Sequence, residues 1–232
     1  VTLRHLASSK TRFLHASRNP SMNAACNSPE SSRSEARRAQ ILSAARDCFR
    51  RHGFHGASIS QICRQAGMSA GHIYHYFDNK EAIIAAIVEQ DLSRLLTMTA
   101  ELRAAENIEQ TMTQCAAEGV HENLDPDTAA LKLEIVAEGS RNPRVAEIVR
   151  DAERCCHDSM VVTVREMRRS LGLDTDEAWI DGLVEFFATL YDGLLVRSVR
   201  NPGEPSAALL ALFSKVILDL VKTPSPLPRD KP

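Results

Sequence analysis

The chain has 232 residues, of which 44% are hydrophobic and 25% are charged, a composition typical of a soluble protein of one or two domains. Aromatic residues make up only 5%, and alanine, leucine, glutamate and arginine are abundant, which favours an all-α fold. No run reaches the roughly 18 apolar residues that a membrane-spanning helix needs. The sequence therefore predicts a cytoplasmic protein with no membrane partner.

The formal net charge of −2 is unevenly distributed along the chain. Residues 33–90 carry eight basic and five acidic side chains, and residues 1–32 carry four basic and one acidic. Residues 91–232 carry 16 basic and 24 acidic side chains. A basic end joined to an acidic body indicates that the basic end contacts a polyanion.

The two ends of the chain show no apolar periodicity. Residues 1–33 are rich in serine, asparagine and proline, so we expect a disordered N-terminal extension. The segment has no continuous apolar stretch of the kind that a signal peptide needs. Because position 1 is valine, we expect translation to start either there or at Met22. The proline-rich residues 223–232 are expected to form a disordered tail.

The first helical segment begins at Ser34. Its apolar residues recur at helical spacing, which indicates one buried stripe: Ile41, Ala44, Ala45, Cys48 and Phe49. Gly53 is expected to end this helix.

Two short helices and a long one follow the first. Ser58 is a natural N-cap for a helix from Ile59 to Gln65. The tight turn Ala66-Gly67-Met68 leads to Ser69, which is expected to cap a helix over residues 70–76. Two short helices joined by a glycine-containing turn form a helix-turn-helix. Asp78-Asn79 then caps a helix from Lys80 to about Ala104.

The rest of the chain predicts five more helices, separated by proline, glycine and asparagine. Their expected ranges are 107–122, 126–139, 143–171, 175–199 and 205–222. Broad apolar faces on the last two predict a dimer interface: Ile180, Leu183, Val184, Phe187, Leu190, Tyr191 and Leu194 on one, and Leu209, Leu210, Phe213, Val216, Ile217 and Leu220 on the other.

The N-terminal segment resembles the TetR family of transcriptional regulators. The matching motifs are Gln40-Ile41-Leu42-Ser43-Ala44-Ala45, Phe49, Gly53-Phe54, Ser58, Ile62, Ala66-Gly67-Met68-Ser69, Gly71, Ile73-Tyr74-His75-Tyr76-Phe77 and Lys80-Glu81. Residues 131–144, with Glu134, Ala137, Glu138 and Asn142-Pro143, are similar to betaine-regulator-type ligand domains. The resemblance implies about nine helices, with a DNA-binding domain at 34–82 and an effector-binding and dimerisation domain at 83–222.

The resemblance also implies a function, that of a homodimeric repressor which a small molecule releases from a palindromic operator. Two helices, near 175–199 and 205–222, would form the dimer. Residues 70–76 would enter the major groove, which admits one α-helix.

Each DNA-binding candidate has an expected role. Ala70 and Gly71 are small and let the backbone approach DNA, whereas His72 is the candidate for a base contact. Tyr74, His75 and Lys80 are expected to contact phosphates, and His75 also a base. Ser58 and Ser69 direct helix N-termini toward the DNA backbone. Ile59, Ile62, Ile73 and Phe77 are expected to be core.

The effector pocket is expected among the helices that start near 80, 107, 126, 143 and 175. Its candidate lining residues are Met98, Met112, Cys115, Ile135, Met160, Trp179, Phe186 and Tyr191, each of which also suits an ordinary core. Glu134 and Glu138 lie one helical turn apart. They form either a solvated acidic face or, if buried, a site favouring a cationic ligand.

Other classes of function have less support in the sequence. No motif orders residues for catalysis, so we expect no enzyme and no cofactor. Cys155-Cys156-His157 suggests a metal or a thiol switch, but neighbouring helical side chains point about 100° apart, so we expect no metal site. Two alternatives remain, a DNA-binding scaffold without a ligand and a thiol- or redox-responsive regulator.

Overall fold

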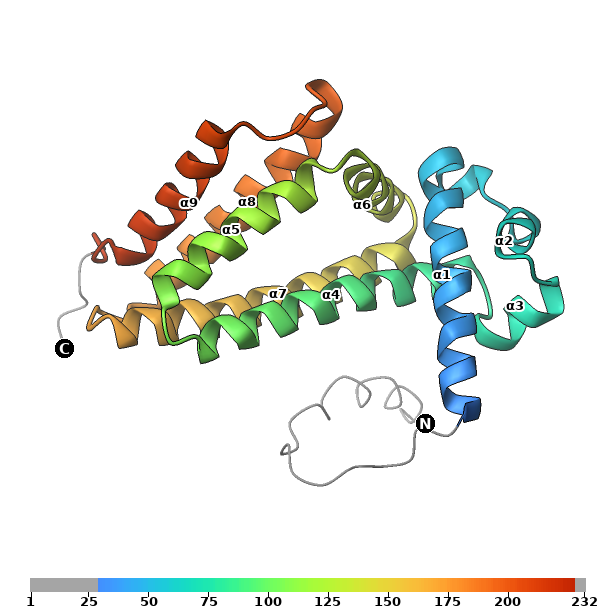
Figure 1. The fold of residues 1–232 in the computed structure, drawn as a ribbon, viewed down its shortest axis with the longest axis horizontal. Helices are drawn as coiled ribbons and strands as arrows, with labels where there is room; N and C mark the ends of the chain where they lie inside the picture. The colour runs from blue at the N-terminus through green and yellow to red at the C-terminus, as the bar shows by residue number, and fades with distance from the viewer. Residues whose placement is uncertain (1–28, 228–232) are drawn as a thin grey trace, which may run out of the picture. The chain divides into compact units, whose positions relative to one another are not determined.

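The computed structural model describes residues 29–227, and every regular element in that range is an α-helix (Figure 1). The helices are α1 (Pro29–Gly56), α2 (Ile59–Ala66), α3 (Ala70–Tyr76), α4 (Lys80–Ala104), α5 (Ile108–Leu124), α6 (Pro126–Gly139), α7 (Pro143–Ser170), α8 (Glu177–Arg200) and α9 (Ala207–Lys222). The all-α prediction is confirmed. Within residues 29–227, no helix is long and apolar enough to cross a membrane.

The observed boundaries differ from the predicted ones mainly at α1. This helix begins at Pro29 rather than Ser34, so residues 29–33 are helical where the sequence predicted an extension without structure. Proline suits the first position of a helix because its missing N–H would have no partner there. The predictions for residues 1–28, including those for Val1 and Met22, lie outside the described residues.

Side-chain caps explain why most helices start where they do. Asn79 and Asp125 accept hydrogen bonds from the amides of Ala82 and Thr128, both at 2.8 Å. These bonds satisfy N–H groups that have no partner within the helix. Asn142, Asp176 and Ser206 cap α7, α8 and α9 in the same way.

One apolar core unites the first helices with parts of the second half. Ile41, Phe49, Ile62 and Ile73 from α1–α3 belong to it. Leu131 and Ile135 of α6 and Val145 of α7 join the same cluster. The packing therefore does not divide at residues 82–83, where the sequence predicted a domain boundary.

A second core lies among α5, α7, α8 and α9, with Leu102 of α4. Residues on α4 and α7 lie side by side along much of their length (Figure 1). The Arg168 side chain is fully buried in this half. It donates to the carbonyls of Val221 and Thr223 at 2.7 and 2.8 Å and forms an ion pair with Asp174 at 3.0 Å.

The Arg168 contacts correct part of the prediction of a disordered tail. Besides the bond that Thr223 accepts, Ser225 donates its amide to Asp174 at 3.3 Å. Residues 223–225 are thus fastened to the α7–α8 connection. The sequence offered no signal for this contact because Arg168 lies in an arginine-rich helix end that suggests only solvated charge.

Candidate nucleic-acid interface

Two serines cap the helices of the helix-turn-helix, as the sequence predicts. The Ser58 hydroxyl accepts from the Gln61 amide at 3.2 Å, and the Gln61 side chain accepts from the Ser58 amide at 2.6 Å. This reciprocal pair is a capping box. The Ser69 hydroxyl accepts from the His72 amide at 3.3 Å.

The turn between α2 and α3 depends on one glycine. Gly67 has φ 64° and ψ 35°, a left-handed conformation that L side chains adopt at a cost. Its amide donates to the Arg64 carbonyl at 3.3 Å, and the Met68 amide donates to the Cys63 carbonyl at 2.9 Å. These bonds close α2 and direct the chain into α3.

The two faces of α3 have different chemistry. Ile73 is fully buried, and Phe77, which ends the helix, is 4% exposed. The exposed face gathers the predicted DNA-binding residues: Ser69, Ala70, Gly71, His72, Tyr74 and His75. Tyr74 leaves 52% of its surface in solvent, so it is not one of the core aromatics.

Nothing in the described part of the chain requires a glycine at position 71. A Cβ added there would meet nothing within 4 Å. A glycine inside a helix costs about 0.5–1 kcal/mol relative to alanine. A residue that destabilises its own helix and leaves open space above it suits close approach of another molecule to the backbone.

Tyr76 is a residue whose role the sequence did not reveal. Its half-buried ring lies 5.5 Å from the ring of His72 and 5.2 Å from that of His75. Aromatic pairs at such separations attract one another. Tyr76 thus supports both exposed imidazoles, and the four-residue spacing of His72 and Tyr76 on a helix was the available signal.

Lys80 makes contacts within the chain that the sequence did not predict. Its ammonium donates to the carbonyls of Phe54 and Ala57 at 2.6 and 2.9 Å and lies 4.3 Å from the centre of the Phe54 ring. These contacts fasten the end of α1 and the link to α2 to the start of α4. They give Lys80 a structural role, and its phosphate contact stays a prediction.

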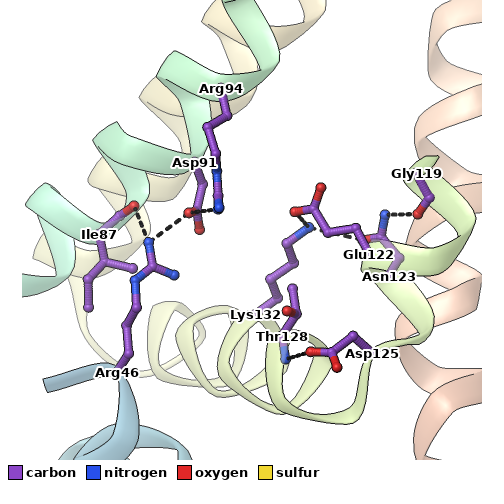
Figure 2. A network of polar contacts seen from close by, with 10 residues as sticks. All are labelled: Arg46, Ile87, Asp91, Arg94, Gly119, Glu122, Asn123, Asp125, Thr128 and Lys132. Atoms are coloured by element: carbon purple, nitrogen blue, oxygen red, sulfur yellow. Dashed lines mark hydrogen bonds and ion pairs between the residues drawn. The ribbon is translucent and has the colours of Figure 1, made fainter. Parts of the chain in front are cut away.

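Two side chains of α1 hold the helix-turn-helix in place. Gln40 donates to the Ala66 carbonyl at the end of α2 at 2.8 Å. Arg46 pairs with Asp91 of α4 at 2.8 Å and also reaches the Ile87 carbonyl (Figure 2). Arg94 bonds to the same aspartate from the next turn of α4. The orientation of α3 therefore depends on α1 and α4.

The predicted effector-pocket residues do not converge on one cavity. Met98 and Cys115 line an open groove of about 410 Å³ between α4 and α5, together with the polar Glu101 and Gln114. The remaining candidates lie elsewhere: Met112 is buried and Met160, Trp179 and Tyr191 are half-buried in the second half, Ile135 is in the first core, and Phe186 is 45% exposed.

The apolar faces that predicted a dimer are mostly used inside the chain. Ile180, Leu183, Val184, Phe187 and Leu194 of α8 are buried in the monomer, as is Ile217 of α9. A different set of large apolar side chains remains exposed on these two helices: Phe186, Val196, Val199, Leu212 and Val216. Of these, only Val216 belongs to the faces predicted from the sequence.

The α8 surface also exposes two glycines. Gly182 and Gly193 share a helical face with Phe186, since residues four and eleven positions apart align on a helix. A Cβ added at either glycine would meet nothing within 4 Å. This face therefore lets a second helix approach closely.

Burial disfavours the thiolate form of three of the described cysteines. Burial and the nearby Glu153 raise the pKa of Cys156 to about 11, which leaves little of the reactive thiolate at neutral pH. Burial also raises the pKa of Cys48 and Cys115. Among the described residues, no three histidine, cysteine or acidic side chains gather as metal ligands.

Comparison with known proteins extends these observations to most of the chain. Residues 41–87 match the family described as "Bacterial regulatory proteins, tetR family", and residues 120–222 match "BetI-type transcriptional repressor, C-terminal". The HTH-type transcriptional regulator UidR of Escherichia coli is 34% identical over 139 residues, 60% of this chain and 70% of UidR.

Solved structures agree with the family match. GusR of Salmonella enterica has a TM-score of 0.66 and 29% identity, covering 81% of this chain and 96% of that one. A transcriptional regulator from Saccharomonospora viridis in complex with choline has a TM-score of 0.59 and 21% identity, covering 82% and 96%; at that identity the likeness shows the fold alone. The chain belongs to the TetR family of DNA-binding helix-turn-helix transcriptional regulators, with a BetI-type repressor C-terminal half.

Proposed function

We propose that this repressor acts in the cytoplasm as a homodimer that binds a palindromic operator and is released from it by a small-molecule effector. The observation that carries the DNA-binding part is the exposed face of α3, where Gly71 and Tyr74 have no packing role and Tyr76 supports both imidazoles. His72 and His75 are the base-contact candidates, and Tyr74 with the capped N-termini at Ser58 and Ser69 contacts phosphate.

Dimerisation is supported by the exposed apolar residues of α8 and α9. Each α3 reads one half-site, and two half-sites on one face of DNA lie about 34–36 Å apart or a multiple of a helical turn. Only a dimer presents two such helices, so the proposed palindrome and the proposed dimer depend on each other.

Effector release is supported by the choline-bound structure of the Saccharomonospora viridis regulator and by the groove between α4 and α5. Arg94, Glu101 and Glu118 line this groove with Met98 and Cys115, a mixed lining that suits a small polar molecule. Because α4 continues directly from the helix-turn-helix, a ligand that binds one position of α4 more tightly shifts the population of DNA-competent dimers.

The alternatives lack comparable support. A thiol-responsive regulator requires reactive thiolates, whereas burial raises the pKa of three cysteines. A scaffold without a ligand is separated from a ligand-released repressor by titration of candidate effectors into the protein–DNA complex. Release of operator by a compound, abolished by a groove-filling Cys115→Trp substitution, supports the repressor; release that survives Cys115→Trp places the effector elsewhere.

The experiment that tests DNA recognition is selection of binding sites from a random DNA pool. We expect a palindrome with half-sites about one helical turn apart. His72→Ala should relax the preference for bases while leaving the half-site spacing unchanged, because spacing depends on the dimer. Binding by the wild-type protein that ignores base sequence would contradict the proposal.

A further inference from the structure

The α6 helix presents one face to the end of α1 and the turn that follows it. Asp127, Leu131, Glu134, Ile135 and Glu138 recur at helical spacing. Leu131 and Ile135 are buried in the same core as Phe49 and Phe54, and Asp127 forms an ion pair with Arg50 of α1. The α6 helix, which lies in the half predicted to bind the effector, thus completes the core of the DNA-binding half.

α1 is kinked at Gly53, where φ is 67°, so its last residues and the link to α2 together form the α1–α2 turn, residues 53–58. Two carboxylates on this face of α6 hold that turn. Glu134 Oε1 accepts the Phe54 amide at 2.7 Å. Glu138 is fully buried, and its Oε2 lies 3.1 Å from Nε2 of His55. Neither Glu138 oxygen has an aligned hydrogen-bond donor within the described chain, and besides His55 its nearest basic side chain is Arg141, at 3.8 Å. Glu134 and Glu138 thus form a clasp on this turn.

A different side of α6 is attached to α5. Lys132 donates to Glu122 at 3.2 Å and to Asn123 at 3.0 Å (Figure 2). Asn123 in turn donates to the Gly119 carbonyl at 2.8 Å. α5, which forms one wall of the α4–α5 groove, is therefore joined to α6 through short polar contacts.

We propose that Glu134 and Glu138 are positioning residues, through which α5 and α6 set the orientation of α2 and α3 by way of the α1–α2 turn. This inference rests on the proposed function. It names a second route beside α4, which is joined to α1 separately by Arg46 and Asp91. The turn leads directly into Ser58, the cap of α2, so a displacement of Phe54 and His55 displaces the reading helix.

The Phe54–Glu134 hydrogen bond and the His55–Glu138 contact are both costly to break. A charge-assisted hydrogen bond to a main-chain amide is about twice as strong as a neutral one. A fully buried carboxylate that is pulled away from its basic neighbours keeps the penalty of its lost hydration. Both contacts therefore favour one arrangement of α6 against the turn. Coupling between two sites requires an element that has such a preferred arrangement and a second one to which it can shift.

The test uses the reciprocity of coupling, which needs no identified effector. If α6 affects operator binding, operator binding affects α6 by the same factor. The probe is operator DNA selected from the random pool, and the readout is amide hydrogen exchange in residues 126–139. We expect operator to slow exchange there by roughly 5-fold or more in the wild-type protein.

Variants separate coupling from folding. Glu134→Ala with Glu138→Ala should abolish the slowing in α6 while operator still slows exchange in α3. Glu134→Gln should retain it, because the amide oxygen still accepts from Phe54. Glu147→Ala, which removes a carboxylate of α7 outside the clasp, is the matched control and should behave as wild type. Should the double variant not fold, Glu138→Gln, which keeps size and removes charge, replaces it and should reduce the slowing.

The outcomes distinguish this inference from the proposed function. A wild-type protein that selects no operator contradicts the proposed function. A wild-type protein that binds operator without slower exchange in α6 overturns the clasp. So does a folded double-alanine variant, or a folded Glu138→Gln variant, in which operator still slows α6 exchange fully.

Discussion

Gly71 is the residue at which the stability of the protein and its DNA binding are expected to change in opposite directions. Replacing Gly71 with alanine should stabilise α3 by about 0.5–1 kcal/mol, since nothing lies within 4 Å of the added Cβ. The same methyl group should weaken operator binding by about tenfold, equivalent to about 1.4 kcal/mol, because it separates the backbone from DNA. Urea denaturation and DNA titration measure the two effects, and unchanged operator affinity would contradict a close approach at α3.

Lys80 should affect stability rather than salt-dependent binding. Removing its ammonium in Lys80→Met leaves two carbonyls of the α1–α2 segment without their donor, and hydrogen bonds to charged groups are worth about 1.5–3 kcal/mol. We expect a lower urea midpoint and an unchanged slope of operator affinity against salt concentration. A slope of log affinity against log salt concentration that is smaller by about one in Lys80→Met would instead support a phosphate contact by Lys80.

At the scale of helices, the cap at Asp125 predicts a pH dependence. The Thr128 amide donates to Asp125, and this bond lowers the pKa of that carboxyl below its ordinary value of 3.8. A lowered pKa in the folded state means that the cap stabilises α6 above the ordinary pKa and is lost as pH falls through the folded pKa. The wild-type advantage over Asp125→Ala, about 0.5–2 kcal/mol at about pH 6, should therefore shrink toward about pH 3.

The Asp125→Asn variant provides the control for this cap. Asparagine still accepts the Thr128 amide but does not titrate, so its difference from Asp125→Ala should stay constant between about pH 6 and pH 3. Urea midpoints at the two pH values check both statements. An Asp125→Ala difference that does not change with pH would show that the carboxylate charge contributes nothing to the cap.

Helix boundaries were predictable where a local cap or break defines them. The ranges of α3, α4 and α6 follow from Ser69, Asn79 and Asp125, whose side chains act within one turn. The contacts of Lys80 and Arg168 were not predictable, because their partners are main-chain carbonyls of distant segments that no residue type encodes. The burial of Glu138 was equally hidden, since an acidic residue on a helix gives no sign of it.

At the scale of the whole molecule, most of the α8 face that was predicted to form the dimer is buried within the monomer. Apolar periodicity identifies a helix face that is buried, but it does not say whether the same chain or a second chain covers it. The structure places Ile180, Leu183 and Phe187 in the monomer core and leaves Phe186 and Leu212 exposed. The exposed set thus gives a sharper test of assembly than the sequence did.

Placing charged side chains among the exposed apolar residues of α8 and α9 should disrupt the dimer without unfolding the chain. Phe186→Glu with Leu212→Glu places carboxylates on surfaces that are 45% and 62% exposed in the monomer, so the chain should keep its helical circular dichroism. Sedimentation should show a monomer, because an unpaired charge at the centre of an interface is costly to bury. Affinity for the full palindrome should fall by about 10²- to 10⁴-fold, the gain that linking two reading modules supplies, while half-site affinity stays the same. Val136→Glu, equally exposed on α6 at 56%, is the control that should remain dimeric, and a double variant that stays dimeric would place the interface on another face.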